Sequence, residues 1–227
     1  MAQRKGATTH MPTTTQTHTK TLKESVADQL RRDIVSGALL PGTIIRDLEL
    51  AQRYEASTSP VREAVTLLTA EGLIEMPPNR PKQVTHVDRQ SAREHVAVFK
   101  LLTIAAYEWG APRVDAHGVK EMRKALELIK RMPHDGDPQA FIAAARAYED
   151  VVLRASGNRP LRRMLIQLFS TIERVVVLWR IKGPLRLQGM EAVVQALEAG
   201  DPQAAVAHCR ELMDRFQQDV EALAPFL

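Results

Sequence analysis

Hydrophobic and polar positions follow the 3.6-residue period of an amphipathic helix through most of the chain after residue 20. The first periodic segment opens with Thr21-Leu22-Lys23-Glu24, a capping-box pattern, and Gly37 is typical of a helix end. Pro41-Gly42 then predicts a turn. The residues expected to face a core from this helix are Val26, Ala27, Leu30 and Ile34.

Two further helices follow at short intervals. A short one is predicted near Asp47, burying Leu48, Ala51 and Tyr54. The next is predicted to begin with Ser59 as its N-cap and Pro60 at the first helical position. Its apolar residues have the spacing i, i+3, i+4, i+7 and are Val61, Ala64, Val65 and Leu68.

Two short strands are predicted after Gly72. Residues 73–76 and 82–85 have strand character, and the sequence PPNRP between them predicts a stiff turn. Three helices followed by a hairpin predict a winged helix-turn-helix over residues 21–88. We expect a disordered tail at residues 1–20, which are rich in threonine and contain no acidic residue.

The rest of the chain, residues 89–227, predicts an all-helical bundle. The string GDPQA occurs at residues 136–140 and 200–204, and each time its Asp is a candidate N-cap followed by Pro. The expected fold class is therefore mainly α, with a winged helix-turn-helix followed by a helical effector and dimerisation domain. The predicted helices are 90–110, 113–132, 138–156, 159–182, 187–199 and 202–223.

Composition narrows the function classes. The chain has 227 residues, of which 44% are hydrophobic, and a single cysteine, Cys209, which fits a reducing cytoplasm. No apolar run reaches the roughly 18 residues of a membrane span, so we expect a cytoplasmic protein with no membrane partner. No Walker, Rossmann or zincin pattern occurs, and Cys209 next to His208 does not form a dyad, because neighbours on a helix diverge by about 100°. We therefore predict that the protein is not an enzyme.

The net charge of the chain favours nucleic-acid binding, but the charge of the predicted DNA-binding region does not. The net charge is +4, but residues 21–88 carry eight Lys/Arg against ten Asp/Glu. DNA binding by this region therefore requires its arginines to gather on one face.

Several segments resemble the GntR family of bacterial transcriptional regulators, and the helical part resembles the FCD effector domain of that family's FadR-type branch. The resemblance implies a homodimer that binds a palindromic DNA operator, usually as a repressor, and a small-molecule effector in the helical domain. The segments that carry it are Asp28-Gln29-Leu30-Arg31, Gly37, Pro41-Gly42, Glu49-Leu50-Ala51, Ser59-Pro60-Val61-Arg62-Glu63-Ala64 and Ala70-Glu71-Gly72-Leu73-Ile74.

Candidate DNA contacts cluster at the start of the third helix. Hydroxyls and amides at a helix N-terminus suit phosphates and base edges, and the guanidinium of Arg62 can bind guanine or phosphate with two bonds. Many relatives have arginine at the position of Thr58 and glycine at that of Asn79, which tolerates positive φ. Together with contacts implied by the resemblance, the predicted set is Arg46, Ser57, Thr58, Ser59, Pro60, Arg62, Asn79, Arg80 and Lys82.

The resemblance also implies a metal site that this chain lacks. Many FCD domains hold a divalent metal with one Asp and three His, and these four positions fall on Ala145, Glu149, Met190 and Leu212. Only Glu149 is able to coordinate, so we predict no metal cofactor.

An organic effector is expected instead. Arg146, Arg174 and Arg180 are candidate anchors for a carboxylate, the effector class the resemblance implies. Each arginine is equally consistent with a surface or salt-bridged role. The remaining candidates for the effector site are Glu149, Trp179 and Met190, and Trp109 and Tyr148 are predicted in the core or the pocket wall. Met190 and Leu212 favour a more hydrophobic effector. Alternatives are a small-molecule binding protein of the same fold with weakened or lost DNA binding, and a helical-bundle enzyme.

Overall fold

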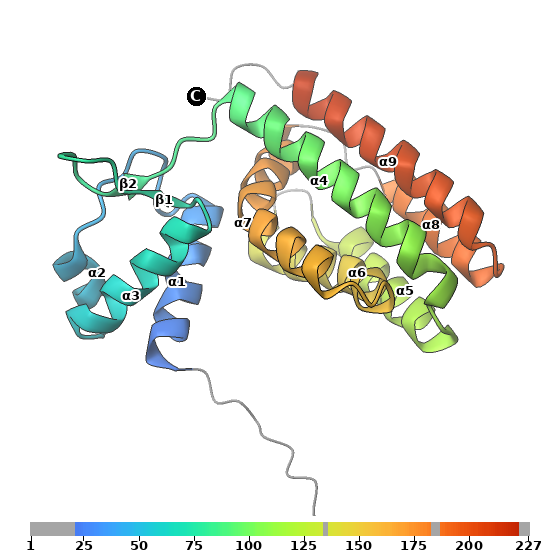
Figure 1. Ribbon diagram of the computed structural model, residues 1–227, viewed down its shortest axis with the longest axis horizontal. Helices are drawn as coiled ribbons and strands as arrows, with labels where there is room; N and C mark the ends of the chain where they lie inside the picture. The colour runs from blue at the N-terminus through green and yellow to red at the C-terminus, as the bar shows by residue number, and fades with distance from the viewer. Residues whose placement is uncertain (1–20, 134–135, 183–186, 223–227) are drawn as a thin grey trace, which may run out of the picture.

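The computed structural model describes residues 21–133, 136–182 and 187–222, without the side chains of residues 178–182. Two parts lie side by side (Figure 1), with the winged helix-turn-helix on the left and the helical bundle on the right. The first part consists of α1 (Leu22–Ser36), α2 (Asp47–Arg53), α3 (Thr58–Ala70), β1 (Ile74–Glu75) and β2 (Gln83–Val84). The mainly helical fold class is confirmed.

Local signals explain where α1 begins and ends. The Thr21 hydroxyl accepts from the amide of Glu24, while the Glu24 carboxylate accepts from the amide of Thr21, so the predicted capping box is present. Gly37 follows the helix with φ of 83° and donates its amide to the Ile34 carbonyl. A residue with a Cβ is strained at that φ, which is why glycine stands here.

Two predicted details of the next helices are wrong. The N-cap of α3 is Ser57 rather than Ser59, so Pro60 occupies the third helical position. That position is still tolerated, because the first turn of a helix has no internal acceptor for its amides. In α2, Leu50 and Ala51 are buried, whereas Leu48 is 65% exposed. The helix is only two turns long, and its buried face is chosen by contact with α3, not by its own periodicity.

The wing is a short antiparallel hairpin in which Ile74 pairs with Val84 and Glu75 with Gln83. An isolated bridge between Ile44 and Gln83 ties the segment before α2 to it. Asn79 at the tip has φ of 59°, so the predicted tolerance of asparagine for this conformation is used.

The second part consists of α4 (Arg89–Gly110), a 3-10 turn (Ala111–Arg113), α5 (Ala116–Arg131), α6 (Pro138–Ala155), α7 (Arg159–Lys182), α8 (Leu187–Glu198) and α9 (Pro202–Ala222). Asp137 and Asp201 cap α6 and α9 and accept from the amides of Gln139 and Ala204, as the two GDPQA strings predict. The helix predicted from residue 113 begins later, because Asp115 caps α5 and Pro112 lies in the 3-10 turn.

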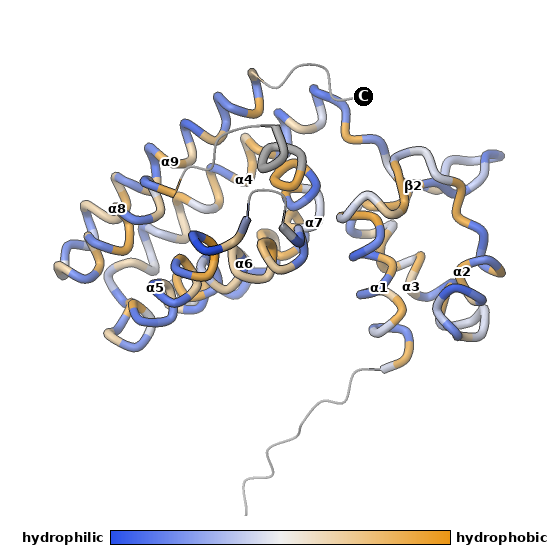
Figure 2. Tube along the Cα trace, turned by 180° about the vertical axis from the view of Figure 1, so that it is seen from behind, coloured by the Kyte–Doolittle hydropathy of each residue, from blue (hydrophilic) through white to orange (hydrophobic). Residues whose placement is uncertain are grey.

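Each part has its own hydrophobic core. One cluster includes Val26, Leu30 and Leu68, and the largest cluster lies among the helices after residue 87. Figure 2 shows hydrophobic residues on the inward faces of the helices, whereas the loop that joins β1 to β2 is hydrophilic. Trp109 departs from its predicted core position, because its face of α4 is uncovered and the residue is 45% exposed. Among the described helices, none is long and apolar enough to cross a membrane.

Helix α7 joins the two parts. Arg174 donates from Nη2 to the Thr85 carbonyl at 2.8 Å and from Nη1 to the Thr85 hydroxyl at 3.1 Å. Ser170 donates to Glu71 at 3.2 Å, and the same Glu71 carboxylate receives two bonds from Arg31 of α1. Val35, Ile142 and Val177 form a small buried cluster beside these polar contacts. The orientation of the winged part therefore depends mainly on α7, with a smaller contribution from α6 through Ile142 and Gln139.

Arg174→Gln tests this junction. Hydrogen bonds from a charged donor contribute about 1.5–3 kcal/mol each, so we expect backbone amides of residues 82–88 to exchange with solvent roughly tenfold faster or more. Hydrogen exchange followed by mass spectrometry measures this, with α5 and α9 as internal references. Arg154→Gln, in an exposed arginine that pairs with Glu121 within the bundle, is the matched control. Unchanged exchange at residues 82–88 would contradict a supporting role of Arg174.

Candidate nucleic-acid interface and internal cavity

The N-terminus of α3 is open to solvent. Ser57 and Ser59 are exposed, Thr58 and Pro60 are half-buried, and the Ser57 side chain makes no capping hydrogen bond. The first turn contains no acidic residue, so the positive end of the helix dipole is not neutralised there. Short hydroxyls and helix-terminal amides together form a surface suited to phosphate oxygens and base edges.

Asp47 gathers basic side chains beside that helix end. Its Oδ2 accepts from Arg62 Nε at 3.1 Å, and its Oδ1 accepts from Lys82 Nζ at 2.5 Å. Burial acts to raise the pKa of Asp47, but the bonds from Lys82 and Arg62 outweigh it and leave the pKa below its ordinary value. The carboxylate therefore stays ionised and holds α3 and the wing strand in a fixed relation. Arg62 keeps 70% of its side chain exposed, so the rest of its guanidinium is available.

The other predicted contacts lie on the same elements. Arg46 precedes α2, is exposed and pairs with Glu49 at 2.8 Å. Asn79 and Arg80 are exposed at the wing tip. Although residues 21–88 are not basic overall, Arg46, Arg62 and Lys82 come together around the start of α2.

A cavity of about 130 Å³ lies inside the helical part. Four of the chain's five phenylalanines line it, namely Phe99, Phe141, Phe169 and Phe216. The other apolar residues of the wall are Ile129, Ala145, Ile172, Val176, Leu187, Met190, Leu212 and Met213. Among the described lining residues only Arg146 and Glu149 are charged.

The four positions that the resemblance assigns to metal ligands meet in this cavity. Ala145, Glu149, Met190 and Leu212 all line it, although they come from α6, α8 and α9. Divalent metals in such sites need several carboxylate or imidazole donors, and this set offers one carboxylate. No group of three or more His, Cys, Asp or Glu that could hold a metal occurs among the described residues. The residues present do not fit a metal ion.

Glu149 is the unusual group of the cavity. It has no hydrogen-bonding or ion-pair partner among the described residues, and burial raises its pKa from the ordinary 4.5 to about 7. The residue is half-buried and lines the cavity. The nearby Tyr148 hydroxyl does not serve it, because that hydroxyl donates to the Met190 carbonyl at 2.9 Å.

Arg146 lines the cavity but is already paired. Its Nε donates to the carboxylate of Glu173, a buried residue of α7, and its guanidinium lies 5.5 Å from the centre of the Phe169 ring. Burial raises the pKa of Glu173 and the pairing with Arg146 opposes that rise. Arg146 therefore neutralises a protein carboxylate.

The other candidate anchors are placed elsewhere. Arg174 is absent from the described lining of the cavity and binds Thr85 at the junction of the two parts. Burial lowers its pKa to about 10, so it remains positively charged at neutral pH. The side chains of Trp179 and Arg180 lie outside the described residues. Cys209 is buried, as a small core residue would be.

Sequence reasoning missed three groups of residues. Asp47 bridges positions 15 and 35 residues away, Glu71 and Thr85 contact α7 about 90 to 100 residues later, and the phenylalanines of the cavity come from four different helices. Contacts over such distances leave no periodic signal. The local signal in the sequence is the i, i+4, i+8 spacing of Phe141, Ala145 and Glu149, which places these three cavity residues on one face of α6.

Glu149 makes the stability of the fold pH-dependent. Because its pKa is raised from 4.5 to about 7, the folded chain keeps a proton that the unfolded chain has released between these pH values. The free energy of unfolding therefore falls as pH rises from 4.5 to 7, and it stays lower above pH 7. We expect Glu149→Gln to be more stable than the wild type at pH 8 by up to about 3 kcal/mol, and nearly equal at pH 5. Urea unfolding at both pH values measures the difference, with Glu211→Gln, in a 65% exposed side chain, as control. A constant difference between the two pH values would contradict the raised pKa.

Comparison with known proteins agrees with this geometry. The profile of the FCD domain matches residues 94–215, and that of the bacterial regulatory proteins of the gntR family matches residues 22–84. McbR/YncC of Escherichia coli has a similar fold, with a TM-score of 0.74 and 21% identity, covering 87% of this chain and 95% of that one.

Curated relatives extend over most of the chain. A probable D-xylose utilization operon transcriptional repressor of Paenarthrobacter nicotinovorans is 30% identical over 187 residues, 82% of each protein. The gluconate operon transcriptional repressor of Bacillus subtilis is 26% identical over 207 residues, 87% of this chain and 84% of that protein. The chain therefore belongs to the GntR family of bacterial transcriptional regulators with an FCD domain, and it is a regulator rather than an enzyme.

Proposed function

We propose that the protein is a homodimeric repressor that binds a palindromic operator and responds to a small molecule in the cavity of its FCD domain. The observation that carries the DNA-binding part is the exposed start of α3 with Arg62 and Lys82 held beside it by Asp47. The operator-facing set is Arg46, Ser57, Thr58, Ser59, Pro60, Arg62, Asn79, Arg80 and Lys82.

Docking on DNA follows from this arrangement. The N-terminal turn of α3 enters the major groove, where Arg62 reads a base edge. Lys82 and Arg80 on the wing bind phosphates, which position the domain without reading sequence. Asp47 keeps Arg62 from swinging free in the unbound protein, so less side-chain freedom is lost on binding.

Arg62→Ala is expected to reduce operator affinity by 10- to 100-fold or more while the fold stays intact, since one bidentate base contact contributes about 1–3 kcal/mol per half-site. Fluorescence anisotropy with an operator obtained by selection from random oligonucleotides measures it. Arg154→Ala, in the helical part, is the matched control. Equal affinity of Arg62→Ala and wild type would remove Arg62 from the contact set.

If the wild type selects no sequence, the chain is instead a small-molecule binding protein of this fold that has lost DNA binding.

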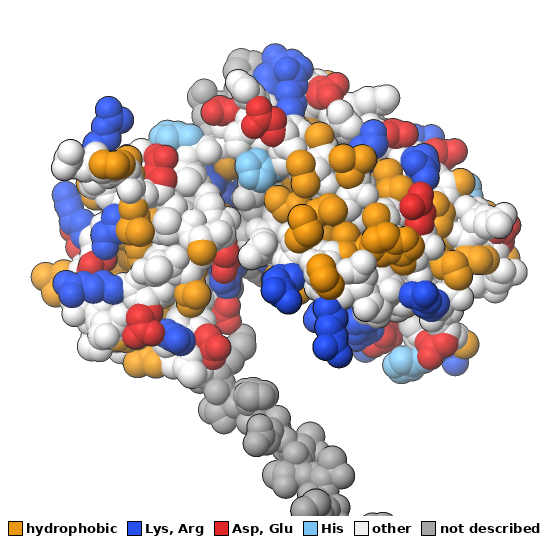
Figure 3. All heavy atoms as spheres, in the orientation of Figure 1, with side chains coloured by type: hydrophobic (Ala, Val, Ile, Leu, Met, Phe, Trp, Pro, Cys, Tyr) orange, Lys and Arg blue, Asp and Glu red, His pale blue; other side chains and the backbone are white. Residues whose placement is uncertain are grey.

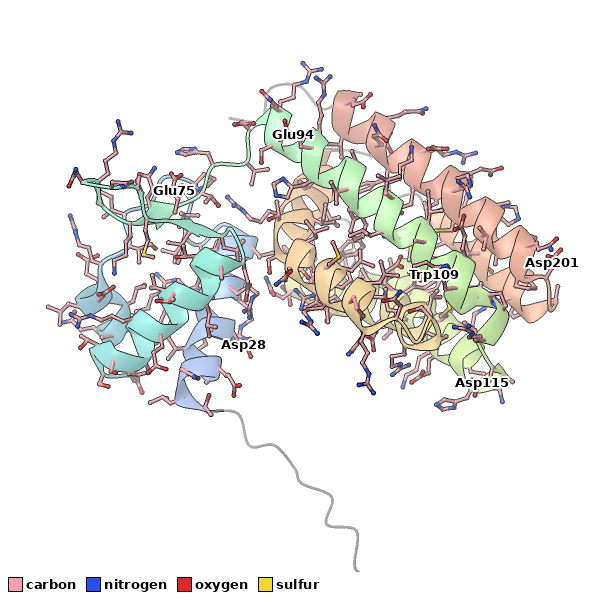
Figure 4. All side chains as sticks on the ribbon, viewed as in Figure 1. Asp28, Glu75, Glu94, Trp109, Asp115 and Asp201 are labelled. Atoms are coloured by element: carbon pink, nitrogen blue, oxygen red, sulfur yellow. The ribbon has the colours of Figure 1, made fainter. Side chains whose placement is uncertain are left out.

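A second copy of the chain is the proposed cover of an apolar face. Hydrophobic side chains gather on the bundle over α4 and α7 (Figure 3), and Trp109 points outward from α4 on the same side (Figure 4). Leu101 is 67% exposed, and Val98, Trp109 and Met164 are between 45% and 51% exposed. Exposed apolar patches of this kind mark interaction sites. A two-fold pair of chains also presents two α3 helices, as two half-sites require.

Leu101→Glu should convert the dimer into a monomer, because it places a charge on the apolar face at its 67% exposed leucine. Sedimentation equilibrium at micromolar concentration measures the change, and operator affinity should fall with it. Leu128→Glu is the control, since Leu128 is also an exposed leucine, 48%, but lies on α5. A dimer that survives Leu101→Glu and dissociates with Leu128→Glu would place the interface elsewhere.

Helix α7 is the proposed link between effector and DNA. Phe169, Ile172 and Val176 of this helix line the cavity, while Ser170 and Arg174 bind the winged part. A ligand that displaces the cavity face of α7 also displaces the face that holds Glu71 and Thr85. The effector then changes operator affinity to the extent that it binds one arrangement more tightly than the other.

A further inference from the structure

We propose that the effector of this protein is a small apolar molecule of about one ring that carries a protonated amine, bound directly by the Glu149 carboxylate without a metal. The proposal rests on the proposed function in that it assigns the ligand class of the same regulatory cavity. It replaces both the organic acid expected from the sequence and the metal chemistry of the domain family.

The Glu149 carboxylate favours a cationic ligand. Glu149 faces an apolar cavity and has no partner among the described residues, so its ionised form is costly there. An ammonium group supplies both the opposite charge and the hydrogen-bond donors that Glu149 lacks. A cationic ligand therefore gains affinity from a carboxylate that no described residue of the protein pairs with.

The positive charge of the described cavity wall is already neutralised. Arg146 is the only described cation of the wall, and it pairs with the buried Glu173. An acidic ligand would have to draw Arg146 away and leave Glu173 buried without its partner, a strongly unfavourable change. It would also approach Glu149, which has the same charge. Both effects disfavour an organic acid.

The size and the wall chemistry of the cavity suit a ligand of about one ring. The cavity of about 130 Å³ is close to the roughly 150 Å³ of an apolar protein cavity that accepts benzene. Phenylalanine faces also attract cations, as the Arg146 and Phe169 pair illustrates. A polyhydroxylated ligand would need many polar partners, and the described wall has two charged groups, one of them already paired.

Isothermal titration calorimetry of the full-length protein with three matched probes tests the proposal. The probes are 2-phenylethylamine, 2-phenylethanol and 3-phenylpropionate, which share one ring and differ in the charge of the end group. Each is titrated into the wild type, Glu149→Gln and Glu211→Gln, in buffer containing EDTA. Operator affinity of the same preparations is measured without and with each probe.

We expect the amine to bind the wild type and Glu211→Gln most tightly of the three. Its affinity for Glu149→Gln should be lower by a factor of at least about 30, because loss of one partner of a buried charge pair costs roughly 2–5 kcal/mol. Circular dichroism of Glu149→Gln verifies that this variant is folded.

Several results would overturn the proposal: no binding of the amine, tighter binding of the acid, equal amine affinity in Glu149→Gln, or binding that appears only when Zn²⁺, Ni²⁺ or Mn²⁺ is added. In each of these cases intact operator binding leaves the proposed function standing and removes only the ligand class. If the amine binds but the protein binds no operator, the ligand class stands and the proposed DNA-binding function is removed.

Discussion

Helix α7 packs against two neighbours, the apolar cavity and the winged part, and the arrangement of the rest of the structure depends on these two contacts. One of its faces closes the apolar cavity with Phe169, Ile172 and Val176, and another supports the winged part through Ser170 and Arg174. Both faces belong to the same helix, so a displacement of α7 moves them together. The proposed coupling of the cavity to Glu71 and Thr85 therefore requires no other element.

Two buried charged residues of α7 fix its position relative to α6 and the winged part. Arg174 is held by neutral oxygens of Thr85, and Glu173 is held by Arg146 from the cavity side. Each group is costly to bury unless its partner stays in place, so relative movement of α6, α7 and the winged part carries an energetic penalty. The same logic makes Glu149 stand out, since among the described residues it has no partner at all.

The cavity brings together the four positions that the family resemblance assigns to metal ligands. Ala145, Glu149, Met190 and Leu212 all line it, and three of the four are apolar. This set offers one carboxylate, which is too few donors for a divalent metal. The described wall consists largely of phenylalanine and aliphatic side chains, which is compatible with a small apolar ligand.

The sequence by itself determined what depends on neighbouring residues. The capping box at Thr21, the caps at Asp137 and Asp201, the positive φ at Asn79 and the exposed Arg62 at the start of α3 all follow from local rules. Only the tertiary structure decided that Leu48 is exposed and Leu50 buried, that Asp47 holds Arg62 and Lys82, and that Arg174 binds Thr85 rather than an effector. The reason is physical: caps and turns are satisfied within a few residues, whereas a buried charge or a cavity wall is completed by residues tens of positions away.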